Sequence, residues 1–535
     1  MERVTLLDST LRDGAQGEGI SFSVADKLDI VRTLDELGVD VIEAGNPASN
    51  PKDLEFFSAI GNLQLSRSRI AAFGSTRRKG VEPRDDAGLR SLLGAGTETV
   101  VVFGKSWDFH VTRILGAELE ENLSMIAESC AYLRAEGRRV LYDAEHFFDG
   151  YAANPDYAMR TLASAAEGGA ECLVLCDTNG GSLPDRVRDL TALVVQKLGL
   201  PVGIHAHNDA GLAVANSLVA VEAGAVHVQG TLVGFGERCG NANLSTIACD
   251  LKLKLGRECL ADDALPHLTG AVRRIAEIAN IVFDEGMPYV GRHAFAHKAG
   301  MHADAVIKAT ASFEHVDPAL VGNDRRILAS EVGGRSVILE KMKRLVPGLT
   351  KDSPAVALVA ERLKEMERLG YQFEGADGSL ELLMRKATGR YKPFFELGHF
   401  RTIGEQPSGD RERCAQAVVK VEVEGETEMC AAEGNGPVNA LDLALRKALG
   451  RFYPNLASMH LIDYKVRVIN SSGATAAVVR VLIESADATD VWTTVGVSTD
   501  IIEASWIALV DSIEYKLIKD MERRWKPYIR EATWE

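Results

Sequence analysis

Short apolar runs rich in β-branched residues alternate with amphipathic helical stretches from the N-terminus to about residue 260, and this alternation constrains the fold most strongly. Strands that are buried on both faces of a parallel sheet have this apolar character. The segments between the runs, such as residues 25–34, carry apolar residues at helical spacing. Eight strand–helix units over about 250 residues predict a (β/α)8 barrel. The expected strands occupy residues 4–8, 39–44, 70–74, 99–104, 139–143, 172–176, 202–207 and 226–230.

A doubly wound open sheet is the alternative fold for alternating strands and helices. Such sheets commonly carry a Gly-x-Gly-x-x-Gly turn after the first strand, where a helix N-terminus binds a dinucleotide. No such turn follows residues 4–8. The barrel is therefore favoured.

The formal net charge of the 535-residue chain is −16. Nucleic acids and anionic membranes are bound by clustered Lys and Arg, so this charge argues against both as partners. No apolar run approaches the roughly 20 residues that a membrane-spanning helix needs. The chain also opens directly into an expected strand rather than a secretory signal. The sequence therefore predicts a cytoplasmic protein without a membrane segment.

Polar residues follow the expected strands, where a barrel assembles its active site. A loop or a helix cap is an equally good explanation for any one of them. So many polar residues at one rim nevertheless favour a catalytic site. They include Arg12, Asp13 and Gln16 after the first strand, Glu145 after the fifth, Thr178 after the sixth, His205 and His207 at the seventh, and Asn241 after the eighth.

His205 and His207 lie two positions apart, so along a strand they point the same way. Two neutral imidazoles on one face make half of a divalent-metal site. Asp13 and Asn241, from other strand ends, complete a set of one carboxylate, two imidazoles and one amide oxygen. This set suits Mn, Zn or Co, and suits Mg less well. Arg12, beside Asp13, supplies a fixed positive charge where an oxyanion could develop.

The pattern changes after the barrel, and we expect three domains: a barrel over 1–265, helical linker subdomains over 266–402, and a C-terminal α+β domain over 403–535. The linker region contains a second polar stretch with His302, and a loop-like segment at 403–412 precedes the last domain. That domain has two similar halves, each with strands, a Gly-rich turn and a helix. A duplicated unit of this kind suggests a small-ligand or dimerisation module, with simple stabilisation of an oligomer as the alternative.

Four of these motifs resemble those of the 2-isopropylmalate, homocitrate and citramalate synthases. They are Leu11-Arg12-Asp13-Gly14-x-Gln16, His205-Ala206-His207-Asn208-Asp209, Gly236-Glu237-Arg238-Cys239-Gly240-Asn241 and Gly300-Met301-His302. Further segments look most like the (R)-citramalate synthases within that family. These segments are 104–107, 143–150, 176–181 and 314–318, and the likeness extends over nearly the whole chain.

The resemblance implies a Claisen-type condensation in which acetyl-CoA adds its methyl carbon to the keto group of pyruvate. Hydrolysis of the thioester would then give (R)-citramalate and CoA, in isoleucine biosynthesis. It also implies a homodimer and a C-terminal allosteric domain with isoleucine as the effector. By motif, the resemblance implies that the metal ligands are Asp13, His205, His207 and Asn241. It implies that the keto acid is bound by Arg12, Thr178 and Gln16. It also implies that Glu145 and His302 form the acid–base pair, with His302 donated by a partner chain.

Some positions depart from the citramalate synthase pattern. Phe313 stands where a tyrosine is expected before Glu-His, and Asn46 and the segment 233–235 also differ. An extra residue between Tyr142 and Glu145 leaves Asp143 as an alternative general base. Other functions therefore stay open: condensation with another 2-oxo acid, as in 2-isopropylmalate or homocitrate synthase; a lyase or carboxyl transferase on the same barrel; and a non-catalytic amino-acid sensor.

Overall fold

The computed structural model describes residues 3–49, 51–61, 63–298, 300–328, 334–343, 345–404, 414–469, 477–487 and 490–531. The chain divides into two compact units, one of Met1–Phe295 with His315–Arg325, and one of Ala296–Glu314 with Arg326–Glu535. The first unit continues past the expected domain limit at residue 265. The division into three domains remains a prediction.

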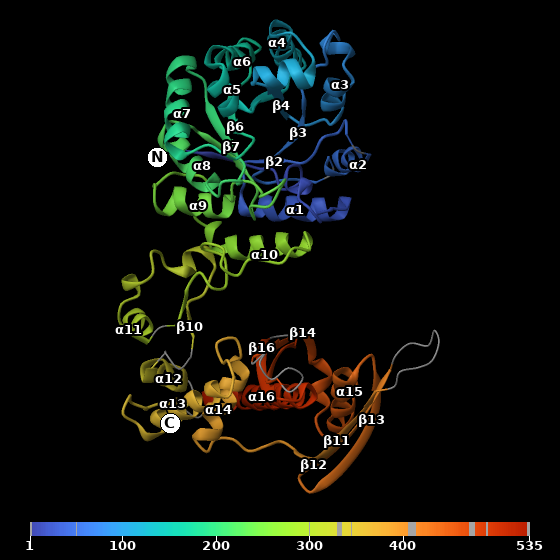
Figure 1. The fold of residues 1–535 in the computed structure, drawn as a ribbon, viewed down its shortest axis with the longest axis vertical. Helices are drawn as coiled ribbons and strands as arrows, with labels where there is room; N and C mark the ends of the chain where they lie inside the picture. The colour runs from blue at the N-terminus through green and yellow to red at the C-terminus, as the bar shows by residue number, and fades with distance from the viewer. Residues whose placement is uncertain are drawn as a thin grey trace. The chain divides into compact units, whose positions relative to one another are not determined.

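Eight parallel strands close into a barrel in chain order, with β8 paired to β1 (Figure 1). This confirms the expected (β/α)8 fold. The strands are β1 (Thr5–Asp8), β2 (Val41–Glu43), β3 (Arg69–Ser75), β4 (Thr99–Lys105), β5 (Arg139–Glu145), β6 (Cys172–Asp177), β7 (Val202–Ala206) and β8 (His227–Gly230). The helices of this unit are α1 (Val24–Leu37), α2 (Pro51–Ile60), α3 (Ala87–Gly94), α4 (Leu119–Ala135), α5 (Phe147–Ala153), α6 (Pro155–Glu167), α7 (Pro184–Leu198), α8 (Ala213–Glu222), α9 (Leu244–Leu253) and α10 (Leu268–Ile278).

Side chains alternate along each strand between the barrel interior and the surrounding helices. One cluster is contributed by strands alone and fills the interior: Leu7, Val41, Ala71, Val101, Leu141, Cys172, Val174 and Cys176. Leu7, Val41 and Leu141 are each followed two positions later by a polar residue, which therefore faces the same way. These polar residues are Ser9, Glu43 and Asp143. The interior therefore changes from apolar to polar toward the C-terminal ends of the strands.

Helix α1, which follows the loop after β1, has well-defined ends. Helix α1 starts with a reciprocal cap, in which the Ser23 hydroxyl accepts from the Asp26 amide and the Asp26 carboxylate accepts from the Ser23 amide. It ends at Gly38, whose φ of 81° is a left-handed conformation that glycine adopts without strain. The helix that follows the segment with Arg12 and Asp13 is thus capped at both ends.

The second unit begins with helical segments and ends in two strand–helix repeats (Figure 1). Each repeat is a three-stranded antiparallel sheet followed by a helix, which confirms the expected duplication. The helical segments are α11 (Gly300–Lys308), α12 (Gly334–Lys343), α13 (Pro354–Arg368) and α14 (Asp377–Ala387), and β9 (Ala296–His297) pairs with β10 (Arg326–Ile327). The first repeat is β11 (Glu396–Gly404), β12 (Ala415–Val423), β13 (Glu426–Gly434) and α15 (Pro437–Gly450); the second is β14 (His460–Val468), β15 (Val479–Ala486), β16 (Val491–Ser498) and α16 (Ile501–Glu531).

The first of these sheets starts before the expected boundary at residue 403, because β11 pairs with β12 along most of its length. Most of the loop-like segment expected at 403–412 lies outside the described residues. Within the described ranges, no helix combines the length and hydropathy needed to cross a bilayer.

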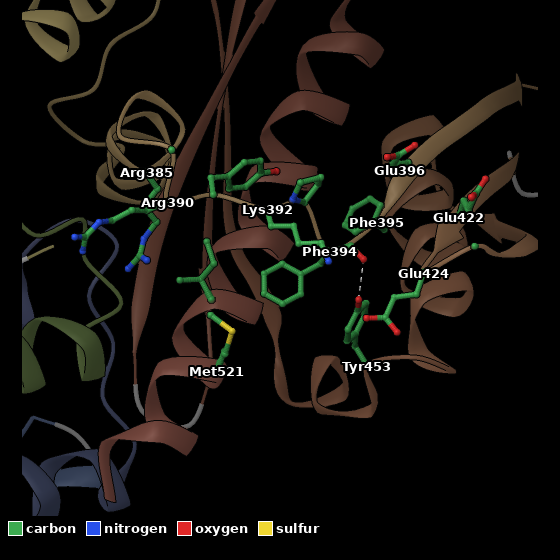
Figure 2. A pocket seen from close by; sticks show the side chains of 15 residues that line it. Arg385, Arg390, Lys392, Phe394, Phe395, Glu396, Glu422, Glu424, Tyr453 and Met521 are labelled. Carbon is green, nitrogen blue, oxygen red and sulfur yellow. Dashed lines mark hydrogen bonds between the residues drawn. The ribbon is translucent and has the colours of Figure 1, made fainter. Parts of the chain in front are cut away.

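A cavity of about 640 Å³ opens in the second unit between α14 and β11 (Figure 2). Its lining includes Arg385, Arg390, Lys392, Glu396, Glu422 and Glu424. The Tyr453 hydroxyl donates to the Phe394 carbonyl at 2.7 Å, and the Phe394 amide donates to Glu514 at 3.1 Å. These bonds fix one wall of the cavity. None of the sequence-predicted site residues lines it.

Candidate metal centre and active site

Asp13, His205 and His207 converge at the C-terminal end of the barrel. The Nε2 atoms of His205 and His207 lie 3.4 Å apart. Asp13 Oδ2 lies 3.9 Å from His205 Nε2 and 3.7 Å from His207 Nε2. Metal–ligand distances of about 2.0–2.2 Å place neighbouring donor atoms roughly 3–3.5 Å apart. Among the described residues, Asp13, His205 and His207 form the one group of His, Cys, Asp and Glu side chains that could hold a metal ion. All three residues are buried.

The protonation states of these groups favour cation binding. Burial and the neighbouring His207 lower the pKa of His205 to about 3, and burial also lowers the pKa of His207. Burial alone would raise the pKa of Asp13, but the charge of Arg12 and the two imidazoles outweigh it and hold that pKa below its usual range. At neutral pH the site therefore offers two neutral imidazoles and one carboxylate.

Asn241 lies beside this group, as its motif predicts. It follows β8 and forms an isolated backbone bridge with His207. Its side-chain amide donates to Asp13 Oδ1 at 2.6 Å. Its Oδ1 atom is buried and has no hydrogen-bond partner among the described residues. A buried acceptor without a donor is costly unless a cation or another group completes it, so the residues present fit a divalent metal ion.

The guanidinium of Arg12 is fixed by two carboxylates and one aromatic ring. Nη1 pairs with Asp13 Oδ2 at 2.7 Å, Nε pairs with Glu43 Oε2 at 2.6 Å, and the group lies over the ring of Phe73 at 3.9 Å from its centroid. Burial would lower the pKa of Arg12, but the charges of Glu43 and Asp13 raise it above its usual value. Arg12 is thus a permanent, oriented positive charge next to the possible metal site.

Glu43 is a further functional candidate, which the sequence places at the active-site rim at the end of the second expected strand but to which it assigns no role. It is the last residue of β2, is fully buried, and also accepts a hydrogen bond from the Ser9 hydroxyl. The available signal was a carboxylate at an inward position of an otherwise apolar strand.

Gln16 lines a cavity of about 310 Å³ with Arg12 and Phe73. Asn46, one of the positions that depart from the family pattern, lines the same cavity. The structure therefore brings Gln16 and Arg12 to one space at the end of β1.

Glu145 and Thr178 stand at the ends of β5 and β6. Glu145 forms an ion pair with Lys105, the last residue of β4. The Thr178 hydroxyl accepts a hydrogen bond from the His146 amide at 2.8 Å. Among the described residues the hydroxyl proton of Thr178 has no acceptor, so it can be donated to a ligand.

Asp143, the alternative general base, is directed into the barrel. It is 3% exposed, and its Oδ1 accepts from the Gln229 amide at 3.0 Å. Burial and the charge of Glu43 raise the pKa of Asp143 to about 8.

Family comparisons divide the chain in the same order as the fold. Residues 3–282 match the HMGL-like family, residues 289–370 the homocitrate synthase post-HMGL domain-like family, and residues 374–517 the LeuA allosteric (dimerisation) domain. The chain is 52% identical to the (R)-citramalate synthase of Synechocystis sp., over 96% of each chain, and 51% identical to that of Geobacter sulfurreducens, over 98% of this chain and 99% of the relative. The chain belongs to the (R)-citramalate synthase family. A probable 2-isopropylmalate synthase of Methanopyrus kandleri is 32% identical, over 96% of this chain and 98% of the relative.

In this member of the citramalate synthase family, His302 belongs to the second compact unit. It lies on α11, is exposed, and stacks on Phe313 with ring centroids 4.1 Å apart. The residue that replaces the expected tyrosine is thus in direct contact with the predicted acid–base histidine. The role of His302 in a partner's site remains a prediction.

Proposed function

We propose that the protein condenses acetyl-CoA with pyruvate and hydrolyses the resulting thioester to (R)-citramalate and CoA, in isoleucine biosynthesis. The observation that carries this proposal is the buried group of Asp13, His205 and His207 directly beside the fixed guanidinium of Arg12. The identity to (R)-citramalate synthases supports pyruvate as the keto acid.

Asp13, His205, His207 and Asn241 would hold the divalent ion, which is Mn, Mg, Zn or Co. When bound, such an ion polarises the carbonyl of the 2-oxo acid. Arg12 would donate to the keto oxygen and stabilise the negative charge that grows there during carbon–carbon bond formation. Thr178, with its free hydroxyl proton, would bind the carboxylate of pyruvate, and Gln16 would orient it from the loop after β1.

Glu145 would take the methyl proton of acetyl-CoA, and His302 of a partner chain would complete the proton transfers. The methyl group next to a thioester is weakly acidic, so its deprotonation requires a positioned base. The burial of Asp143 and its bond to Gln229 favour Glu145 over Asp143 for this role. The match to a dimerisation domain supports a homodimer, in which His302 of a second chain would complete the site.

We expect pyruvate to have the highest kcat/KM in a panel of 2-oxo acids tested with acetyl-CoA and Mn²⁺ or Mg²⁺. One methylene in an apolar pocket discriminates by about 1–3 kcal/mol, so pyruvate should exceed 2-oxoisovalerate at least roughly tenfold. Thiol release measures the rate, and chromatography identifies the product. Preference for 2-oxoisovalerate or 2-oxoglutarate would assign another synthase activity, and no thiol release with any acid would contradict a condensing enzyme.

We also propose that isoleucine binds between C-terminal domains and lowers activity. The duplicated sheet–helix units and the match to the LeuA allosteric domain support this. Added isoleucine should reduce thiol release by the full chain, and a chain that ends before β11 should be insensitive to it. Equal inhibition of both chains would contradict the proposal.

A further inference from the structure

Gln229 bridges two polar groups inside the barrel, and none of the predicted site residues accounts for it. It lies on β8 and is completely buried. Its Oε1 lies 2.9 Å from Nδ1 of His205 on β7. Its Nε2 donates to Oδ1 of Asp143 on β5 at 3.0 Å. One side-chain amide thus connects three strands at the layer directly below the possible metal site.

The direction of these bonds determines which nitrogen of His205 carries the proton. Nε2 of Gln229 donates to Oδ1 of Asp143, which can accept this bond as a carboxylate oxygen or as the carbonyl oxygen of a protonated carboxyl group, so the carbonyl end of Gln229 faces His205. That carbonyl can only accept, and therefore Nδ1 of His205 is the protonated nitrogen. The lone pair then resides on Nε2, the atom that faces His207 and Asp13.

We propose that Gln229 is a positioning residue that fixes the tautomer and ring orientation of His205 for binding of a divalent cation, with Asp143 as the group that orients its amide. This inference rests on the metal-dependent function proposed above. Metal-ligating histidines characteristically donate their second N–H to an acceptor, and loss of that acceptor weakens metal binding about 10–100-fold. Gln229 supplies the acceptor in this chain.

His205 and His207 differ in whether Nδ1 has a hydrogen-bond partner. Nδ1 of His207 is buried and has no hydrogen-bond partner in the described part of the chain. The protein thus orients His205 through a side chain, whereas His207 is held by the backbone bridge to Asn241. Removal of Gln229 should therefore act on the cation site through His205.

Two substitutions separate this role from simple filling of the interior. Q229M keeps the approximate length of the side chain but removes both polar contacts. Q229E keeps an oxygen that accepts from Nδ1 of His205 and removes the N–H that Asp143 accepts. H227A is the matched control, because His227 is a similarly buried residue two positions earlier on the same strand and is not in the metal-binding group.

Mn²⁺ binding to the metal-free full-length variants is measured from the electron paramagnetic resonance signal of the free ion, and thermal melting in EDTA reports folding separately. We expect Q229M to weaken Mn²⁺ binding about 10–100-fold, and Q229E and H227A to stay within about threefold of the parent chain. Unchanged affinity in folded Q229M would overturn the proposal. Equal losses in folded Q229M and Q229E would also overturn it, because keeping the acceptor for Nδ1 of His205 would then not preserve binding.

If Q229M does not fold, Q229E decides. A folded Q229E that loses Mn²⁺ affinity would contradict the role assigned to the contact with His205. A folded Q229E that keeps its Mn²⁺ affinity would support that role. Failure of the parent chain to bind Mn²⁺ would refute the metal-dependent function itself. Failure of Q229M to differ from a parent chain that does bind would refute only the role of Gln229.

Discussion

Replacing His205 with Ala is expected to abolish metal-dependent turnover while the barrel stays folded. His205 supplies one of three converging side-chain ligands, and its loss leaves Asp13 and His207. Polarisation of a carbonyl by a metal ion contributes several kcal/mol, and about 4 kcal/mol corresponds to roughly 10³-fold in rate. We therefore expect kcat/KM for acetyl-CoA and pyruvate to fall by at least about 10³-fold, measured by thiol release with saturating Mn²⁺.

His227→Ala is the control for this change. His227 has the same 4% exposure as His205 and also lies on a barrel strand, but it does not belong to the group of possible ligands. Both variants should lose stability by about 1–3 kcal/mol through the cavity that they leave, and only His205→Ala should lose bound metal. Full activity of His205→Ala after chelation and metal add-back would show that the converging histidines are not a catalytic metal site.

The barrel was predictable because its signal is local. Runs of apolar residues and the helical spacing between them identify each strand–helix unit by itself, and eight units in one domain leave few other arrangements. The pair His205 and His207 was predictable for the same reason, since the alternation of a strand fixes their common facing. Asp13 and Asn241 followed from their place at the same barrel rim, and the structure brings both to the histidines.

The supporting contacts were not predictable, because they join strands that are distant in the chain. Glu43 meets Arg12 across 31 positions, and Gln229 meets His205 across 24 and Asp143 across 86. Which inward side chains meet depends on strand tilt and stagger, and these are properties of the closed barrel rather than of any one segment. Polar residues at inward positions of apolar strands are nevertheless a usable signal, and both Glu43 and Gln229 carry it.

The sequence also left two carboxylates, Glu145 and Asp143, as candidates for the general base, and the substitution Glu145→Gln separates them. Glutamine has nearly the same size but cannot accept the proton. Because a positioned acid or base contributes about 10²–10⁴-fold, we expect kcat to fall by roughly 10³-fold. Mn²⁺ affinity should not change, since Glu145 is not among the converging ligands. Initial-rate thiol release and Mn²⁺ titration measure the two quantities.

Glu171→Gln is the matched control, because it makes the same chemical change in a carboxylate that pairs with Arg139 at the opposite end of the barrel strands. It should leave kcat within about twofold, since partly exposed ion pairs contribute at most about 1 kcal/mol to stability. Deuterated acetyl-CoA gives a second measurement: if Glu145 removes the methyl proton, the isotope effect on kcat/KM should increase in Glu145→Gln, because proton removal then limits the rate. A Glu145→Gln variant with near-normal kcat, beside an Asp143→Asn variant that binds Mn²⁺ normally but does not turn over, would instead identify Asp143 as the base.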